Sequence, residues 1–214
     1  MPIDSLTTLK EKMRAYMKRR TINEEDLFVQ LAEERIVDGF GDEKDDLFTG
    51  PVRVRSMESS TTITIKENEN SGQLPEGFLG FRGPLYVGSG KLVYIPPSVY
   101  RDRQTQTKTP YEYTVIGNNI LTYPTADQDY AIGADIYSLP PLSVTNLSNN
   151  LLIDHPNIYL YVCLLEACIF YKKDSDTLKY HRLFKGAVHA ANRQDEMSRF
   201  SGGTLEMQTS YTCY

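Results

Sequence analysis

Histidine, cysteine and isolated carboxylates are the residue types in this sequence that could carry chemistry. The three histidines are His155, His181 and His189. A metal ion needs ligands that converge on one point. His181 and His189 are eight positions apart on a predicted helix, so they can share a face without converging. We therefore expect no metal site.

The cysteines do not form a reactive pair. Cys163 and Cys168 are five positions apart on an apolar predicted helix, which matches neither a Cys-x-x-Cys motif nor a helical pairing. Buried structural thiols are the favoured interpretation. Cys213, near the end of the chain, could be an exposed reactive thiol, although no neighbouring residue activates it.

Two groups of carboxylates stand out. Glu166 is the one charge in the most apolar helix, so it is either an acid with a raised pKa or the partner of a Lys or Arg from a neighbouring helix or subunit. The second is favoured, because no acid–base partner is identifiable. The acidic run Asp42–Asp46 does not follow the ligand order of an EF-hand, and we expect a solvated loop.

Glycine-rich phosphate loops have a fixed spacing that this sequence lacks. The runs Gly80–Gly83 and Gly88–Gly90 lie in predicted turns and match neither the P-loop nor the dinucleotide pattern. Without a catalytic triad, metal set or cofactor loop, we expect no cofactor and no enzymatic activity.

Composition narrows the classes further. The chain has 214 residues, 40% of them hydrophobic, and a net charge of −5. Such a chain can fold around a core, and an acidic chain does not usually grip nucleic acid. The N-terminus has no apolar core typical of a signal peptide, and the longest apolar stretch, 158–171, is too short to span a bilayer. We expect no membrane span, and the few cysteines indicate a reducing compartment.

The two ends of the chain have helical patterns. Leu6, Leu9, Met13 and Met17 form one stripe, and a second helix is predicted from an N-cap at Asn23 to Gly39. Towards the C-terminus, helices are predicted over 145–152, from 154, and over 175–199. The helix over 158–170 is apolar all round, so it must be covered on every side, by a central place in a bundle or by a neighbouring subunit.

The middle of the chain alternates with the period of strands. Strands are predicted at 52–55, 63–65, 113–116, 120–123 and 130–137, with hairpins at Gly88–Gly90 and Gly117–Asn119 and a short helix from Pro96 to Arg103. The fold class is therefore α+β: a helical bundle domain formed by both chain ends, with an inserted antiparallel β module. The expected domains are 1–50 with 139–200 (helical), 51–138 (β) and 201–214 (a flexible C-terminal tail).

Tyrosine suits half-wet contact surfaces, and the chain has 15 tyrosines. They crowd the β block and the apolar helix. An aromatic surface of this kind is typical of a protein with several contacts, although many of these tyrosines could simply pack the sheet.

Several segments, in order, resemble phage head–tail adaptor (head-completion, connector) proteins. The run Leu74–Phe78 followed by Leu85–Val87 resembles one such segment. The Pro140–Ser143 connector, the stretch Pro156–Tyr161 and the ending Arg199–Gly202 resemble others. The architecture also resembles the tubular tail protein A of podophages.

The resemblance implies a virion structural protein that forms a ring, a dodecamer, below the portal at the capsid vertex. The helical domain would face the portal protein. The β module would point to a tail protein, a stopper or nozzle, or tail fibres. DNA would pass through the channel without specific binding during genome packaging and ejection. The protein would be in the host cytoplasm during assembly and then in the tail neck of the virion.

Three groups of residues are assigned to contacts by their positions. The portal-binding group is Arg193, Arg199, Phe200, Ser201, Gly202, Gly203, Leu205, Met207, Tyr211 and Tyr214. The subunit-interface group is Tyr159, Tyr161, Leu164, Phe170, Tyr180 and Phe184. The group for tail or fibre docking is Tyr100, Arg101, Arg103 and Tyr111.

Two alternatives stay open. One is a docking module for tails or fibres that lies outside the portal ring and uses the β block as its binding part. The less favoured one is a small enzyme that uses carboxylates or histidine in a cleft between the helical and β parts.

Overall fold

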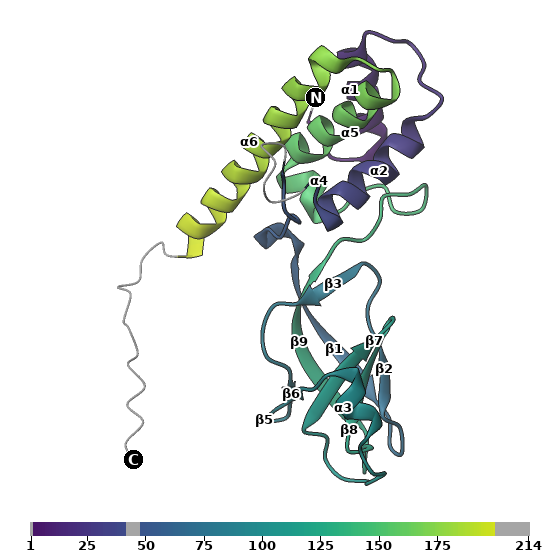
Figure 1. The fold of residues 1–214 in the computed structure, drawn as a ribbon, viewed down its shortest axis with the longest axis vertical. Coiled ribbons are helices and arrows are strands. Elements are labelled where there is room, and N and C mark those ends of the chain that lie inside the picture. The colour runs from purple at the N-terminus through teal and green to yellow at the C-terminus, as the bar shows by residue number, and fades with distance from the viewer. Residues whose placement is uncertain (1, 42–47, 200–214) are drawn as a thin grey trace. The chain divides into compact units, whose positions relative to one another are not determined.

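The computed structural model describes residues 2–41 and 48–199 (Figure 1). Two compact units divide the chain. One combines Met1–Thr8 with Ser56–Asp154, and the other combines Leu9–Arg55 with His155–Tyr214, as far as the described residues reach. We call them the β unit and the helical unit. The α+β class, with helices from both chain ends, is confirmed.

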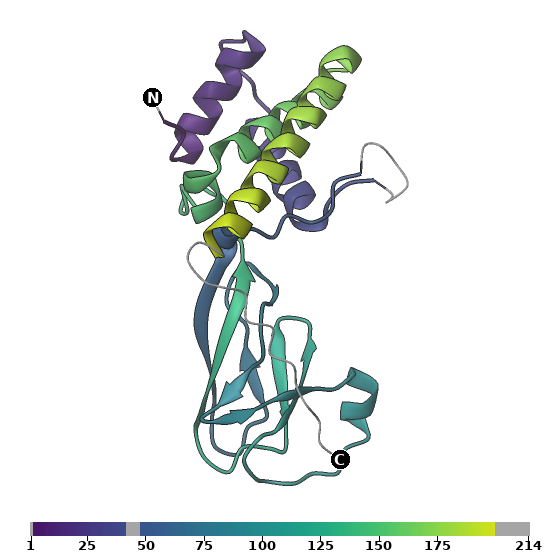
Figure 2. The same cartoon turned by 90° about the vertical axis from the view of Figure 1, so that its left-hand side faces the viewer.

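The helical unit is a bundle. Its elements are α1 (Leu6–Met17, which begins in the β unit), α2 (Glu25–Asp38), α5 (Pro156–Phe170) and α6 (Asp174–Arg199). Figure 2 shows these helices packed together in the turned view. α5 packs against both α2 and α6, and its side chains from Ile158 to Cys168 are buried except Tyr161. The all-round apolar pattern of this helix is thus explained by a central place in the bundle.

Two of the predicted helix starts are wrong. α2 has Glu24, not Asn23, as its N-cap, and no side-chain bond caps it. The helix predicted over 145–152 is α4, which covers only Asn150–Asp154. The preceding residues form a turn, because Ser143 Oγ accepts from the Asn146 N–H at 3.0 Å. Such local bonds compete with a helix.

The predicted strand at 52–55 is also wrong. Val52 and Val54 are buried, but no strand lies beside them. Val52 N–H donates instead to the Ile36 carbonyl of α2 at 2.9 Å, and a 3₁₀ turn follows at Arg55–Met57. The alternation therefore arises from an extended segment packed on a helix.

The β unit contains two sheets. The first comprises β1 (Glu58–Ile65), β9 (Tyr130–Ser138), β4 (Tyr86–Val87) and β5 (Gly90–Lys91) in that order, with β3 (Phe78–Phe81) also on β9. The second has the order β2 (Ser71–Gln73), β8 (Asn119–Tyr123), β7 (Glu112–Ile116) and β6 (Val93–Tyr94). All pairings are antiparallel except β6 with β7. The short helix α3 covers Pro97–Arg101.

Both predicted hairpins are confirmed. β4 pairs with β5 across the turn at Gly88, and β7 pairs with β8 across Gly117. Gly117 has a φ of 60°, a left-handed conformation that favours glycine. The core between the sheets includes Ile63, Ile65, Leu85, Ile120, Ile132 and Ile136.

Candidate functional site

The charged residue of the apolar helix has a structural partner. Arg35 Nε of α2 donates to Glu166 Oε1 of α5, and both side chains are largely buried. The interpretation of Glu166 as one half of an ion pair with a neighbouring helix is confirmed.

The two cysteines of α5 are inert thiols. Both are buried. Burial raises the pKa of Cys163, and the carboxylates of Glu33 and Glu166 add to that rise. Burial also raises the pKa of Cys168. A thiol that stays protonated is a weak nucleophile, so the structural interpretation is confirmed for both. Cys213 lies outside the described residues.

The three histidines lie in three different environments. His155 precedes α5 as its N-cap residue. His181 is buried on α6, with its ring centroid 6.2 Å from that of Phe40. His189 lines a pocket of about 230 Å³ together with Phe48 and Lys185. Within residues 2–41 and 48–199, no three His, Cys, Asp or Glu side chains gather as metal ligands do.

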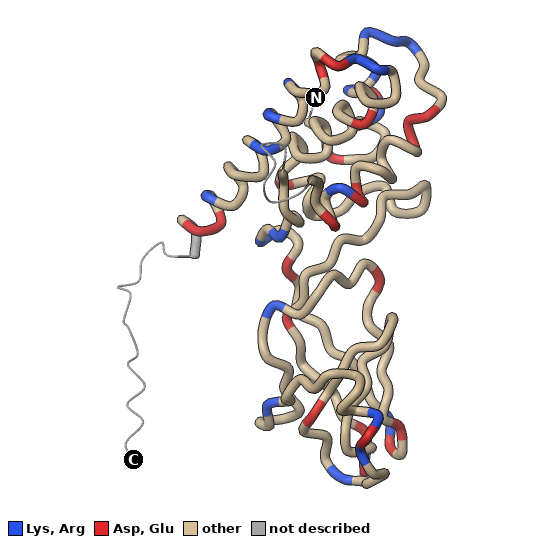
Figure 3. The backbone as a smooth tube through the Cα atoms, in the orientation of Figure 1, with Lys and Arg blue, Asp and Glu red and all other residues tan. Residues whose placement is uncertain are grey.

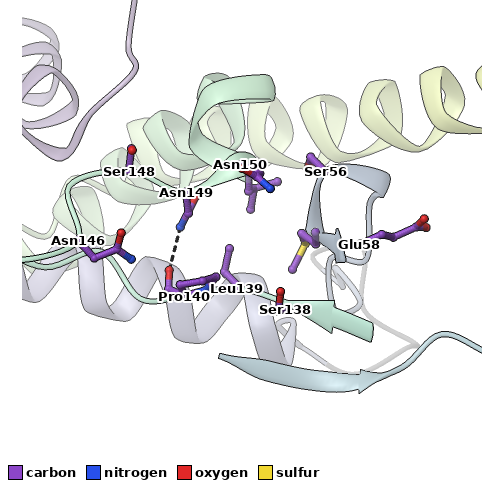
Figure 4. A pocket seen from close by; sticks show the side chains of 11 residues that line it. Ser56, Glu58, Ser138, Leu139, Pro140, Asn146, Ser148, Asn149 and Asn150 are labelled. Carbon is purple, nitrogen blue, oxygen red and sulfur yellow. Dashed lines mark hydrogen bonds between the residues drawn. The ribbon is translucent and has the colours of Figure 1, made fainter. Parts of the chain in front are cut away.

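A polar pocket of about 190 Å³ lies in the β unit (Figure 4). It is built around Asn149, whose Nδ2 donates to the Pro140 carbonyl at 3.1 Å and whose Oδ1 accepts from the Leu152 N–H at 2.9 Å. The one ionisable residue of its lining, Glu58, is paired with Arg82 at 2.9 Å. The Glu58 carboxylate is thus engaged by Arg82, and Asn149 uses its side chain to cap α4.

Three of the four residues predicted for tail or fibre docking, Tyr100, Arg103 and Tyr111, lie outside the strands and contact β7 or β8 of the second sheet. Arg103 Nη2 donates to Glu112 Oε1 at 2.6 Å, and its Cζ lies 5.5 Å from the Tyr123 ring centroid. The ring centroid of Tyr111 lies 6.0 Å from the ring centroid of Tyr123. Tyr100, on α3, accepts from Asn70 Nδ2 at 2.9 Å and donates to the Thr122 carbonyl at 3.4 Å. Arg101 is exposed at the end of α3.

Exposed apolar side chains extend this region, and sequence reasoning did not single them out as docking residues. The ring centroids of Tyr94 and Tyr113 are 5.6 Å apart, and the Val93 N–H donates to the Tyr111 carbonyl at 2.9 Å. The side chains of Val93, Tyr94, Val99 and Tyr111 are between 41% and 57% exposed. We name as the edge patch the residues Val93, Tyr94, Val99, Arg101, Arg103 and Tyr111. Val93 and Tyr94 were missed because a two-residue edge strand with a parallel partner gives too weak a signal in the sequence, and Val99 was missed although it lies next to Tyr100.

The residues predicted for a subunit interface mostly lie in the protomer's own core. Tyr159, Leu164 and Phe184 are fully buried and Tyr180 nearly so. Tyr159 Oη donates to Glu33 Oε1 at 3.2 Å. Phe170 is 49% exposed and Tyr161 is half-buried. Of the six, these two have surface that a second subunit could contact.

The predicted portal-binding group is described only in part. Arg193 is exposed on α6, and Arg199 is the last residue of that helix. The other members lie outside the described residues: Phe200, Ser201, Gly202, Gly203, Leu205, Met207, Tyr211 and Tyr214.

No helix in the described ranges is long and apolar enough to cross a membrane.

Comparison with known proteins gives one family. The chain matches the family model of the SU10 adaptor protein over residues 4–207. None of the curated proteins matches it. Because the match extends over nearly the whole chain, the protein belongs to the SU10 adaptor protein family, a family of phage head–tail adaptors.

Proposed function

We propose that the protein forms a dodecameric ring that binds the portal vertex and connects it to the tail. The ring forms part of the channel through which DNA passes during packaging and ejection. Family membership makes the chain a structural, virion-associated protein that interacts with other head or tail proteins. Assembly on the portal takes place in the host cytoplasm, and the similarity to podophage tubular tail protein A is part of this proposal.

The observation that carries the proposal is the edge patch of the β unit. It comprises exposed Tyr and Val side chains on β6, on α3 and just before β7, together with Arg101 and Arg103 on and after α3. Aromatic residues and Arg are enriched in protein interfaces, where a few anchors supply most of the binding free energy. A structural protein that presents such a patch has a ready contact for a tail protein.

A tagged pull-down from phage-producing cells tests the proposal. The full chain is compared with a chain that ends at Arg199. We expect a portal-sized ring to co-purify with the full chain and to be lost on truncation. If neither chain brings down a capsid or tail protein, the proposal is wrong.

A docking module outside the portal ring is the second candidate, and the edge patch also supports it. The variant Tyr94→Ser/Tyr111→Ser separates the two. If the protein is an adaptor, this variant should still bring down the portal ring but should lose the tail protein. If the protein is a module outside the ring, the wild type should bring down a tail or fibre protein without the portal. Val144→Ser, at an 89% exposed position of the same unit, is the matched control.

A further inference from the structure

One end of the helical unit concentrates positive charge. Here α1 and α5 end and α2 and α6 begin. The segments 18–20 and 171–173 lie side by side, because Arg19 Cζ is 3.8 Å from the Tyr171 ring centroid. Figure 3 shows the two basic segments near one another. We name as the basic end the residues Lys18, Arg19, Arg20, Lys172 and Lys173.

The charges of the basic end are not balanced locally. In the part of the chain that the structure describes, none of its five residues forms an ion pair. Glu25 and Asp26, which lie nearby in α2, are already paired with Arg14 and Lys10. The remaining carboxylates of segments 18–26 and 171–176 are Glu24, Asp174 and Asp176, so five cations face three anions.

Two of these lysines occupy strained backbone positions. Lys18 follows α1 directly and Lys172 follows Tyr171, the C-cap residue of α5. Each has a φ of 53°, at a helix end where glycine is the usual residue. The left-handed conformation is unfavourable for a residue with a Cβ. One cation per helix end would compensate the helix dipole without this strain. The strain and the surplus charge therefore point to a role outside the unit.

A rigid apolar side chain projects beside the cations. Phe170 is 49% exposed, and it is held at 5.4 Å from the buried Phe28 ring and 5.1 Å from Tyr171. Leu27, on α2, is 42% exposed. The basic end thus combines cations with an apolar anchor, which fits an acidic polypeptide that carries apolar side chains.

This chain contains such a polypeptide. The segment 40–48, Phe-Gly-Asp-Glu-Lys-Asp-Asp-Leu-Phe, has four carboxylates and one lysine, a net charge of −3, among two Phe and one Leu. Phe40 is 40% exposed. The segment complements the basic end both in charge and in apolar character.

The segment cannot reach the basic end of its own protomer. It follows the C-terminus of α2, whereas the basic end lies at the N-terminus of α2. A helix of 14 residues is about 21 Å long at about 1.5 Å per residue. The segment is also pinned at its base, since Phe40 and Thr49 exchange backbone bonds of 2.7 and 2.9 Å. Half of the loop spans only about 13 Å when fully extended.

We infer that the basic end of one protomer binds segment 40–48 of a second copy, head to tail. A head-to-tail contact is heterologous and closes into a ring if the rotation permits. The inference rests on the proposed ring and names the contact that would build it. DNA is a less suitable partner for the basic end, because its phosphate backbone would make no apolar contact with the exposed Phe170 and Leu27.

Charge reversal on both sides tests the contact. The first variant is Lys18→Glu/Arg19→Glu/Arg20→Glu, and the second is Asp42→Lys/Asp45→Lys/Asp46→Lys. We expect each alone to lose the self-association of the full chain measured by light scattering, and an equimolar mixture to regain it. Lys66→Glu/Lys91→Glu/Lys108→Glu, at exposed sites of the β unit, changes the net charge by the same amount as the first variant and should leave association intact. Association that survives both variants overturns the inference.

A peptide assay covers a wild type that stays monomeric in solution. A labelled peptide of residues 39–50 should bind the full chain at low salt at least about tenfold more tightly than a scrambled peptide. The first variant and Phe170→Ser should each remove that difference. Equal binding of both peptides overturns the inference, as does tighter binding of duplex DNA through the same cations. If a portal-bound ring still forms, the proposed function stands without this contact.

The strained lysines give an independent readout. Lys18→Gly/Lys172→Gly should raise the Tm of the full chain, because glycine relieves the left-handed strain, yet weaken binding of the peptide. A variant with a higher Tm and undiminished peptide binding would show that these lysines do not serve the contact.

Discussion

Arg35 and Glu166 join α2 to α5 through an ion pair whose side chains are only 10% and 8% exposed. The Arg35 guanidinium also lies over the ring of Phe40, with its Cζ 3.9 Å from the centroid. The charge that the apolar helix carries therefore serves the packing of the bundle. It also holds the residue from which segment 40–48 begins.

Removing one member of this pair should be strongly destabilising. We expect Glu166→Leu to lower the free energy of unfolding by about 3–5 kcal/mol, because it leaves a buried guanidinium without its partner. The double variant Arg35→Leu/Glu166→Leu should cost less than either single one. Urea unfolding of the purified chain measures both. Asp26→Asn, in a pair whose carboxylate is 83% exposed, is the control and should cost about 1 kcal/mol or less. Equal losses for Glu166→Leu and Asp26→Asn would show that burial of the pair has no energetic consequence.

Cys163 should make stability fall at high pH. Burial raises the pKa of its thiol above the ordinary value of 9.0, so above that pH the unfolded thiol is ionised while the folded one keeps its proton. The stability from the protonated thiol is complete below about pH 9 and declines by up to about 1.4 kcal/mol per pH unit above it. Comparing urea unfolding of wild type and Cys163→Ala at about pH 8 and about pH 10 isolates this effect from other titrating groups. The advantage of wild type should shrink at the higher pH, and parallel losses in the two proteins would contradict the assignment.

Phe184 should behave as a core residue. It is fully buried on α6, so Phe184→Ala should lower the free energy of unfolding by about 3–5 kcal/mol through loss of packing and a cavity. Leu178→Ala on the same helix, at a 48% exposed position, should cost about 1 kcal/mol or less. The measurement is again denaturant unfolding, made at a concentration where the chain is monomeric. A small effect of Phe184→Ala there, with loss of association instead, would return this residue to a subunit interface.

Local sequence patterns predicted those helices and turns whose conformation is determined by their own residue types. The all-round apolar run identified α5, and Gly117 identified the hairpin of β7 and β8, because burial and positive φ leave a direct trace in residue type. The strand predicted at 52–55 was wrong because its pattern does not distinguish a strand from an extended segment. Alternation reports which side chains are buried, and an extended chain on a helix buries them with the same period as a strand.

The contact surfaces depend on pairings that no local pattern contains. Tyr100, Arg103 and Tyr111 were chosen from the sequence, but Val93 joins them only because β6 pairs in parallel with β7. The basic end joins residues 18–20 to residues 172–173 through the contact of Arg19 with Tyr171. Each segment alone resembles the ordinary basic end of a helix. Their combined charge becomes apparent only when the fold brings them together.

Gly72 should mark how closely β2 approaches β1. A Cβ at this position would lie 2.7 Å from both Ile63 Cγ2 and Ile65 Cδ1 in the core between the sheets. Gly72→Ala should therefore lower the free energy of unfolding by about 1–3 kcal/mol through overpacking. Gly133→Ala, in β9, is the matched control, because a Cβ there meets nothing within 4 Å. It should be neutral or stabilising by up to about 1 kcal/mol, since alanine restricts the unfolded chain. Thermal or urea unfolding of the two variants gives the comparison, and a Gly72→Ala protein as stable as Gly133→Ala would mean that β2 does not press on the isoleucines of β1.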